Sequence, residues 1–209
     1  MKENSMIEKV EAIVRQRMDG QAAGHGMDHV LRVLVSARAI QSEVGGDLQI
    51  VELAALLHDV GDAKFHDGVE RSAEFAREML SGLGAGDELT EHVAHIVDNI
   101  SFRKGDSAKP LSLEGQIVQD ADRLDALGAI GIVRTIEYGA APPQGVPVQP
   151  FHLPDAGDAK TGVGHFHEKL FKLKSLMNTD AGRRMAEDRE AFMRTFLNQF
   201  LLECGELKG

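Results

Sequence analysis

Apolar residues recur at intervals of three and four along most of this chain, and this spacing restricts its fold more than any other feature. Two stretches show it clearly, one ending at Met18 and one beginning at Val30, whereas strict alternation of apolar and polar residues is hard to find. A helix places every third and fourth residue on one face, so the pattern predicts amphipathic helices. We therefore expect an all-α protein.

The periodicity predicts seven helical segments. They cover residues 4–18, 28–44, 48–59, 69–83, 87–101, 112–138 and 165–204, the last with a break near Asn178. Residues 139–164 interrupt the pattern with five prolines and several glycines, which is a composition typical of loops. We expect this Pro/Gly-rich insertion, which precedes the C-terminal helices, to form a mobile cover over a functional site.

The length and the net charge of the chain restrict the number of domains and the classes of binding partner. The 209 residues suit one compact domain and no linker divides them, so residues 1–209 are expected to form a single domain. A net charge of -10 disfavours a nucleic-acid duplex but not a small phosphorylated substrate in a locally basic cleft. One cysteine, no signal peptide and no bilayer-spanning run predict a cytoplasmic protein without a membrane partner. The oligomeric state is not predicted.

A histidine–aspartate pair ends the most apolar predicted helix. His58 and Asp59 follow the run IVELAALL, and Gly61 is well placed to end the helix. Burying a carboxylate beside an imidazole is costly unless a hydrogen-bond network, an ion partner or a metal compensates. Taken alone, the pair is equally compatible with a helix end that reaches solvent.

Two other predicted helices carry polar residues on apolar faces. Asp122 and Asp125 fall on one otherwise apolar helical stripe. Asp125 fits a structural ion pair with Arg123 or another cation better than Asp122 does. His29 lies on an inward-facing stripe near the start of its helix, although a lone inward histidine is more often an ordinary core residue.

Together these positions supply two imidazoles and two carboxylates from three predicted helices. We therefore predict that one divalent cation is bound by His29, His58, Asp59 and Asp122. Mixed nitrogen and oxygen donors suit Mn²⁺, Fe²⁺, Co²⁺ or Ni²⁺, with Mg²⁺ and Zn²⁺ as alternatives. The lack of thiolate ligands argues against a structural zinc site.

The order of these residues resembles the HD superfamily of metal-dependent phosphohydrolases, and in particular its bacterial YpgQ-like and YedJ-like group. The shared strings are GHGMDHVLRV, LLHDVGD, IVQDADRLDALGAIGI and HFHEKLFKLKSLMNT, and the similarity covers nearly the whole chain. It implies a helical HD fold, a divalent cation at the four positions above, and hydrolysis of phosphate or pyrophosphate esters. For YpgQ-like members it also implies manganese-dependent nucleotide pyrophosphohydrolysis.

The resemblance also points to residues that act on the substrate. Asp62 stands where some HD nucleotidases carry an acid that orients water or protonates the leaving oxygen, and Lys64 is a candidate electrostatic clamp. Substrate contacts are predicted at His25, His95, Asn99, Arg123, His165, Lys169 and Lys172. For each of these residues a solvated surface or loop role is the alternative. His92 and His95 are also candidates for a second metal, but both fit an ordinary helix, so we expect one tightly bound cation.

The predicted reaction converts a nucleoside triphosphate to the monophosphate and pyrophosphate, with Mn²⁺ as the favoured cation. Two alternatives use the same metal site: a phosphomonoesterase and a cyclic-nucleotide phosphodiesterase. A third alternative is a regulatory module that binds a metal or a nucleotide without turnover. With no Trp and one Tyr, a stacked base would need Phe, His or Arg, so no base preference is predicted.

Overall fold

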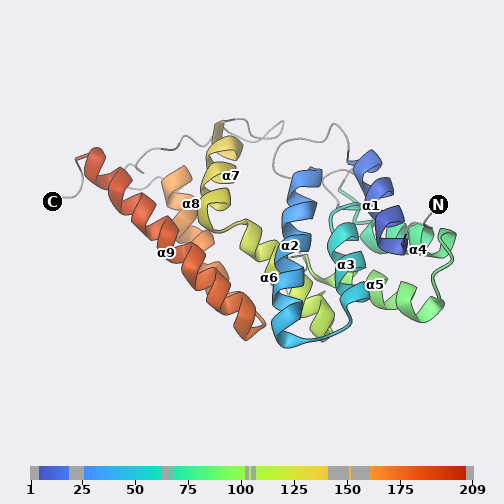
Figure 1. Ribbon diagram of the computed structural model, residues 1–209. Helices are drawn as coiled ribbons and strands as arrows, with labels where there is room; N and C mark the ends of the chain where they lie inside the picture. The colour runs from blue at the N-terminus through green and yellow to red at the C-terminus, as the bar shows by residue number, and fades with distance from the viewer. Residues whose placement is uncertain are drawn as a thin grey trace. The chain divides into compact units, whose positions relative to one another are not determined.

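The computed structural model describes residues 5–18, 26–62, 66, 68–101, 104, 107–140, 151 and 161–205. Within these ranges the chain forms nine α-helices and the 3-10 helix η3, with no β-strand, which confirms the predicted all-α class (Figure 1). None of the helices in these ranges combines the length and the apolar character that crossing a membrane requires. The chain divides into two compact units, Met1–Ala121 and Asp122–Gly209, and a single domain over residues 1–209 stays a prediction.

The first unit contains five helices and most of a sixth. They are α1 Met6–Arg17, α2 Met27–Val44, α3 Leu48–Leu57, α4 Ser72–Gly82, α5 Asp87–Asn99 and α6 Leu113–Asp125. Helix α3 is central, because it packs against α1, α2 and α5, and α4 packs on α5. Residues 53–57 of α3 are completely buried, which explains why this helix is the most apolar of the unit.

Local hydrogen bonds determine where two of these helices begin. Ser5 accepts from the backbone N–H of Glu8, and the Glu8 carboxylate accepts from the backbone N–H of Ser5, so the two residues form a capping box. Asp47 caps α3 by accepting from the N–H groups of Gln49 and Ile50. The Asp47 cap therefore fixes where α3 begins, ten residues before the His58–Asp59 turn that follows it.

The second unit is built from α7 Gly128–Ala140, α8 Gly162–Glu168, η3 Leu170–Leu176 and α9 Asp180–Glu203. Helix α7 packs against α8 and α9, and η3 packs against α8 and α9 (Figure 1). The break predicted near Asn178 is confirmed, since α9 begins only after Thr179, whose hydroxyl accepts from the N–H of Gly182. The predicted helix over residues 165–204 is further divided where α8 gives way to η3.

The single helix predicted over residues 112–138 is wrong, because α6 ends at Asp125 and α7 begins at Gly128. The N–H groups of Ala126 and Leu127 bond to carbonyls three residues back, which tightens the chain into a turn. Gly128 then adopts a φ of 72°, a left-handed conformation that favours glycine. The apolar stripe proposed across this region therefore belongs to two helices.

The predicted loop over residues 139–164 is also too long at both ends. Helix α7 continues through Ala140, and α8 begins at Gly162. The Thr161 hydroxyl starts α8 by accepting from the N–H of Gly164, so glycines that read as loop residues are helical. Residues 141–150 and 152–160 lie outside the described residues, as do His25 and Lys64. The mobile cover stays a prediction.

Candidate metal centre

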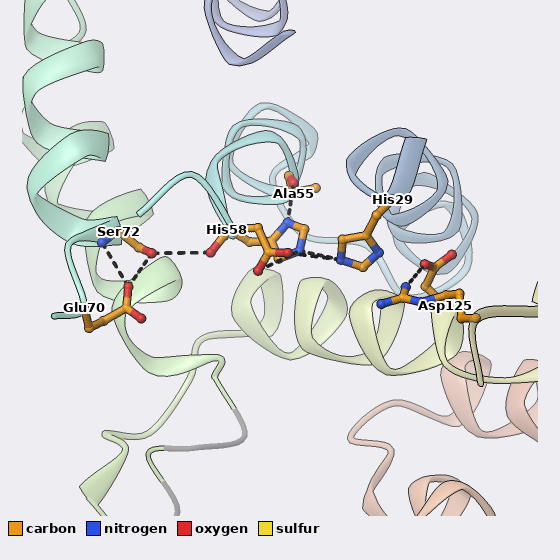
Figure 2. Close-up of polar contacts among 8 residues, drawn as sticks. His29, Ala55, His58, Glu70, Ser72 and Asp125 are labelled. Carbon is orange, nitrogen blue, oxygen red and sulfur yellow. Dashed lines mark hydrogen bonds and ion pairs between the residues drawn. The ribbon is translucent and has the colours of Figure 1, made fainter. Parts of the chain in front are cut away.

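The imidazoles of His29 and His58 meet in the first unit (Figure 2). The carboxylate of Asp59 lies beside them. The two Nε2 atoms are 3.1 Å apart. The Nε2 atom of His29 is 3.5 Å from Oδ2 of Asp59, and that of His58 is 3.7 Å from Oδ1. One ligand atom from each residue lies within 4.8 Å of the other two, so the group is compact enough to hold a metal ion.

Two neighbouring helices deliver these side chains. His29 lies in the first turn of α2, His58 is the C-cap of α3, and Asp59 follows it in the turn. Because α2 packs directly on α3, the start of one helix meets the end of the other. Both histidines are buried, whereas the Asp59 side chain keeps 13% of its surface exposed, which leaves the carboxylate accessible from solvent.

A backbone hydrogen bond sets the tautomer of His58. Its Nδ1 lies 2.8 Å from the carbonyl oxygen of Ala55, and a carbonyl can only accept, so Nδ1 carries the proton (Figure 2). In the neutral ring the lone pair then resides on Nε2, the atom that faces His29 and Asp59. This arrangement is the one that metal-ligating histidines adopt, with the distal nitrogen tied to a carbonyl and the other left to bind.

The measured separations match the spacing of ligands around one cation. With ligand distances of about 2.1 Å, two ligand atoms lie about 3.0 Å apart at a right angle and about 3.4 Å apart at a tetrahedral angle. The 3.1 Å and 3.5 Å separations from Nε2 of His29 are close to these values. Two nitrogen donors and one carboxylate, without a thiolate, form a donor set for a divalent cation.

The two acidic residues of α6 singled out in the sequence differ in their surroundings. Asp125 is buried and forms an ion pair with Arg134, which is the structural role expected for it, with a cation other than Arg123. Arg123 instead donates to the carbonyl of Leu176. Asp122 is half-buried near the end of α6, and its assignment as the fourth ligand stays a prediction.

The histidines of α5 take part in local structural contacts. His92 lies 2.8 Å from the Ser112 hydroxyl, and His95 donates to the carbonyl of Pro110 at 2.9 Å. The Asn99 side chain accepts from the backbone N–H of Lys109 at 2.8 Å. None of the three belongs to the metal-binding group found among the described residues. Substrate contacts by His95 and Asn99 stay predictions.

The remaining predicted substrate residues that the structure describes lie on short segments. Asp62 is half-buried just after the His58–Asp59 turn, and its N–H donates to the Asp59 carbonyl at 3.2 Å. Lys169 and Lys172 are exposed, at the end of α8 and in η3. Burial lowers the pKa of His165, and the positive charge of Lys169 lowers it further. The roles of these residues in binding or catalysis stay predictions.

Asp120, an acidic residue of α6 that is completely buried, was not predicted from the sequence. A signal was present, because Asp120 follows Ile117 by three residues and precedes Leu124 by four, and both of these are fully buried. Ser72, which contacts the His58 carbonyl, and Glu70, which bonds to Ser72, were not predicted either, because these contacts depend on how the chain folds back on itself.

A helical fold that joins one histidine to a histidine–aspartate pair defines a class of metal-binding hydrolase domains, and the chain belongs to the HD-domain superfamily of hydrolases. The HD domain family matches residues 26–127, which contain all three residues of the candidate metal centre. The chain is 41% identical to the YpgQ protein of Bacillus subtilis (strain 168) over 201 residues, which are 95% of this chain and 94% of that protein.

Solved structures of relatives have the same fold. An HD-superfamily hydrolase from Bacillus thuringiensis superposes with a TM-score of 0.79 at 38% identity, over 96% of this chain and 97% of that chain. The crystal structure of Bacillus subtilis YpgQ in complex with ADP superposes with a TM-score of 0.77 at 34% identity, over 95% of this chain and 94% of that chain. The expected HD fold is confirmed over nearly the whole length.

Proposed function

We propose that this protein is a divalent-metal-dependent nucleotide pyrophosphohydrolase that converts a nucleoside triphosphate to the monophosphate and pyrophosphate. The observation that carries the proposal is the buried pair of Nε2 atoms of His29 and His58, 3.1 Å apart beside the Asp59 carboxylate. A site of this kind suits a cation that binds phosphate oxygens. The membership of the HD superfamily makes phosphate-ester or phosphoanhydride hydrolysis the natural chemistry of this site.

Mn²⁺ is the favoured cation, with Asp122 as the proposed fourth ligand. Two imidazoles and two carboxylates leave room in an octahedral sphere for water and substrate oxygens. The same donors accommodate Co²⁺, Fe²⁺ or Ni²⁺, and Mg²⁺ or Zn²⁺ are the remaining alternatives. A bound divalent cation supplies Lewis acidity, which polarises a phosphoryl oxygen and lowers the pKa of water.

The protein's own residues then orient the metal ligand and the attacking water and bind the phosphate. The Ala55 carbonyl holds the His58 ring with its Nε2 lone pair toward the site. Asp62 directly follows residues 58–61, which we call the ligand turn. It is the proposed group that orients the attacking water or passes a proton to the leaving oxygen. Lys64 is the proposed clamp on the phosphate, at a position outside the described residues.

The leaving group determines which bond breaks. We propose that Lys169 and Lys172, which are exposed cations, bind the β and γ phosphates together with Arg123, which also donates to the Leu176 carbonyl. A triphosphate held by its distal phosphates would present its α phosphorus to the cation, and cleavage would then fall between the α and β phosphates. His25, His95, Asn99 and His165 are proposed as further substrate contacts.

A nucleotide ligand is supported by the relative that was crystallised with ADP. A diphosphate nucleotide has an α and a β phosphate, which are the two groups between which the proposed reaction cuts. The chain is similar to that relative along almost its full length, so the support for a nucleotide site comes from the whole fold and not from the HD motif alone.

The test is a panel of nucleoside triphosphates, diphosphates, monophosphates and cyclic nucleotides, assayed with Mn²⁺, with Mg²⁺ and with chelator. Chromatography should show a monophosphate formed directly from the triphosphate, only when metal is present. Turnover restricted to monophosphates or cyclic nucleotides would replace this proposal with the phosphatase or phosphodiesterase alternative. Binding without any turnover would identify a regulatory module.

A further inference from the structure

The turn that carries His58 and Asp59 leaves backbone carbonyls to be satisfied from outside its helix. Helix α3 ends at Leu57, so carbonyls at this end have no intrahelical partner. In the turn that follows, donors from the segment 66–72, at the start of α4, bond to the carbonyls of Val60 and Gly61, and the Ser72 hydroxyl lies near the carbonyl of His58. The segment therefore caps the end of α3 that holds two of the metal ligands.

Each of these contacts comes from a different residue. The Ser72 hydroxyl lies 3.5 Å from the His58 carbonyl (Figure 2). The Nε2 atom of His66 lies 3.2 Å from the carbonyl of Val60, the residue after Asp59. The backbone N–H of Arg71 donates to the Gly61 carbonyl at 2.9 Å. Three of the four residues of the ligand turn are thus contacted by one short segment.

Backbone packing makes this connection rigid. A Cβ atom built on Gly61 would lie 2.3 Å from the backbone nitrogen of Ser72, so only a residue without a side chain permits this approach. The start of α4 and the ligand turn are therefore in direct main-chain contact. A displacement of Ser72 must displace the turn, because no flexible side chain separates the two.

The carboxylate of Glu70 holds Ser72 in place. Arg71, the N-cap of α4, makes no side-chain capping bond. Glu70 fills this role, because its Oε1 accepts from the Ser72 N–H at 3.0 Å and from the Ser72 hydroxyl at 2.5 Å (Figure 2). One acceptor thus fixes both the main chain and the side-chain rotamer of the residue that backs onto the ligand turn.

We propose that Glu70, acting through Ser72, is a positioning residue for the metal ligands His58 and Asp59. This inference rests on the proposed metal-dependent function. Without the Glu70 carboxylate, the start of α4 and the turn beside it lose a constraint, and the site must be ordered when the cation binds. The cation then binds more weakly, although none of its ligands has changed.

The test is the dissociation constant for Mn²⁺, measured by calorimetry on the full chain at a temperature where every variant is folded. Glu70→Ala should raise it by about 5-fold, below the 10–100-fold typical of groups bonded directly to a metal ligand, because Glu70 acts one residue further out. Glu70→Gln keeps an oxygen acceptor without the charge, so its effect should be smaller. Glu78→Ala, which replaces an exposed glutamate of α4, is the matched control and should bind Mn²⁺ as the wild type does.

A second measurement separates positioning from stability. The visible spectrum of Co²⁺ bound at the site reports ligand geometry, and it should shift in Glu70→Ala and Ser72→Ala but not in Glu78→Ala. A lower melting temperature of the metal-free variants, with the Mn²⁺ affinity and the Co²⁺ spectrum unchanged, would show that Glu70 only caps α4 and would overturn the inference.

The same titration tells failure of the inference from failure of the proposed function. If the wild type binds Mn²⁺ and Glu70→Ala binds it equally well, only the positioning role is wrong. If the wild type binds no divalent cation, the metal centre itself is refuted, and the inference with it. Because Glu70 is exposed, its replacement removes no core contact, and Glu70→Gln serves if the alanine variant does not fold.

Discussion

The Nε2 atoms of His29 and His58 face each other across 3.1 Å, while the opposite nitrogen of His58 is bonded to the Ala55 carbonyl. Two buried imidazole nitrogens at this separation can share one proton or point two lone pairs at one cation. The Asp59 carboxylate, 3.5 Å from Nε2 of His29, adds the negative charge that favours the cation.

Removing one of the facing nitrogens should therefore remove the metal. We expect His58→Gln to weaken Mn²⁺ binding by roughly 100-fold or more, since even groups that only support a ligand contribute 10–100-fold. Calorimetric titration of the variant measures this directly. His167→Gln is the matched control, because His167 is exposed and is outside the candidate ligand group. Equal affinity of His58→Gln and wild type would contradict the assignment.

Bound metal should also stabilise the fold. A cation that binds only the native state adds about 2.7 kcal/mol at a concentration 100 times its dissociation constant. Thermal unfolding with Mn²⁺ and with chelator should show this increment in the wild type. In Asp59→Asn the shape is nearly preserved but a ligand charge is lost, so the increment should largely disappear. An undiminished increment in Asp59→Asn would place the stabilising cation elsewhere.

The positive charge of Lys169 should matter for the distal phosphates. We expect Lys169→Gln to lower kcat/KM for a nucleoside triphosphate by roughly 10-fold, the loss of one charge-assisted hydrogen bond. Turnover of an activated aryl phosphate, which lacks distal phosphates, should change much less. Lys109→Gln, which alters another exposed lysine, serves as the control. Equal losses on both substrates would remove Lys169 from the triphosphate site.

Acid should destabilise the second unit through His165. Burial first, and the charge of Lys169 second, lower the pKa of His165 below its ordinary value of 6.5. The unfolded chain therefore binds a proton more readily than the native protein, so the free energy of unfolding decreases as the pH falls below about 6.5. Urea unfolding between pH 7.5 and pH 5, in the presence of chelator, measures this slope.

The variant that isolates this effect is His165→Gln, which cannot take up the proton and should lose less stability over the same interval. His167→Gln, which replaces an exposed histidine on the same helix, should keep the wild-type profile. Identical pH profiles for wild type and His165→Gln would show that other groups cause the acid sensitivity.

Much of the helical fold could be predicted because local physics determines it. Apolar spacing located the helices of the first unit, and the unusual pair His58 and Asp59 marked the end of the buried helix α3. The turn between α6 and α7 was missed because Gly128 lies within an apolar run, and only its φ of 72° reveals the change of direction. Periodicity reports which residues face inward, not where a continuous run bends.

The residue types of the candidate site could be predicted from the sequence, but the residues that hold the site in position could not. The residue types of His29, His58 and Asp59 pointed to a metal before any distance was known. The hydrogen bonds between Ser72 and Glu70, and the contact of Ser72 with the His58 carbonyl, had no such signal, because a glutamate two residues before a serine is ordinary on any surface. Those contacts depend on how α4 returns to the end of α3.

The most direct measurement of the central claim is phosphorus NMR of a nucleoside triphosphate hydrolysed by the protein with Mn²⁺ in ¹⁸O-labelled water. Attack at the α phosphorus predicts ¹⁸O in the monophosphate and unlabelled pyrophosphate, with no reaction in chelator. Orthophosphate and nucleoside diphosphate as the products, or label in the pyrophosphate, would contradict cleavage between the α and β phosphates by attack at the α phosphorus.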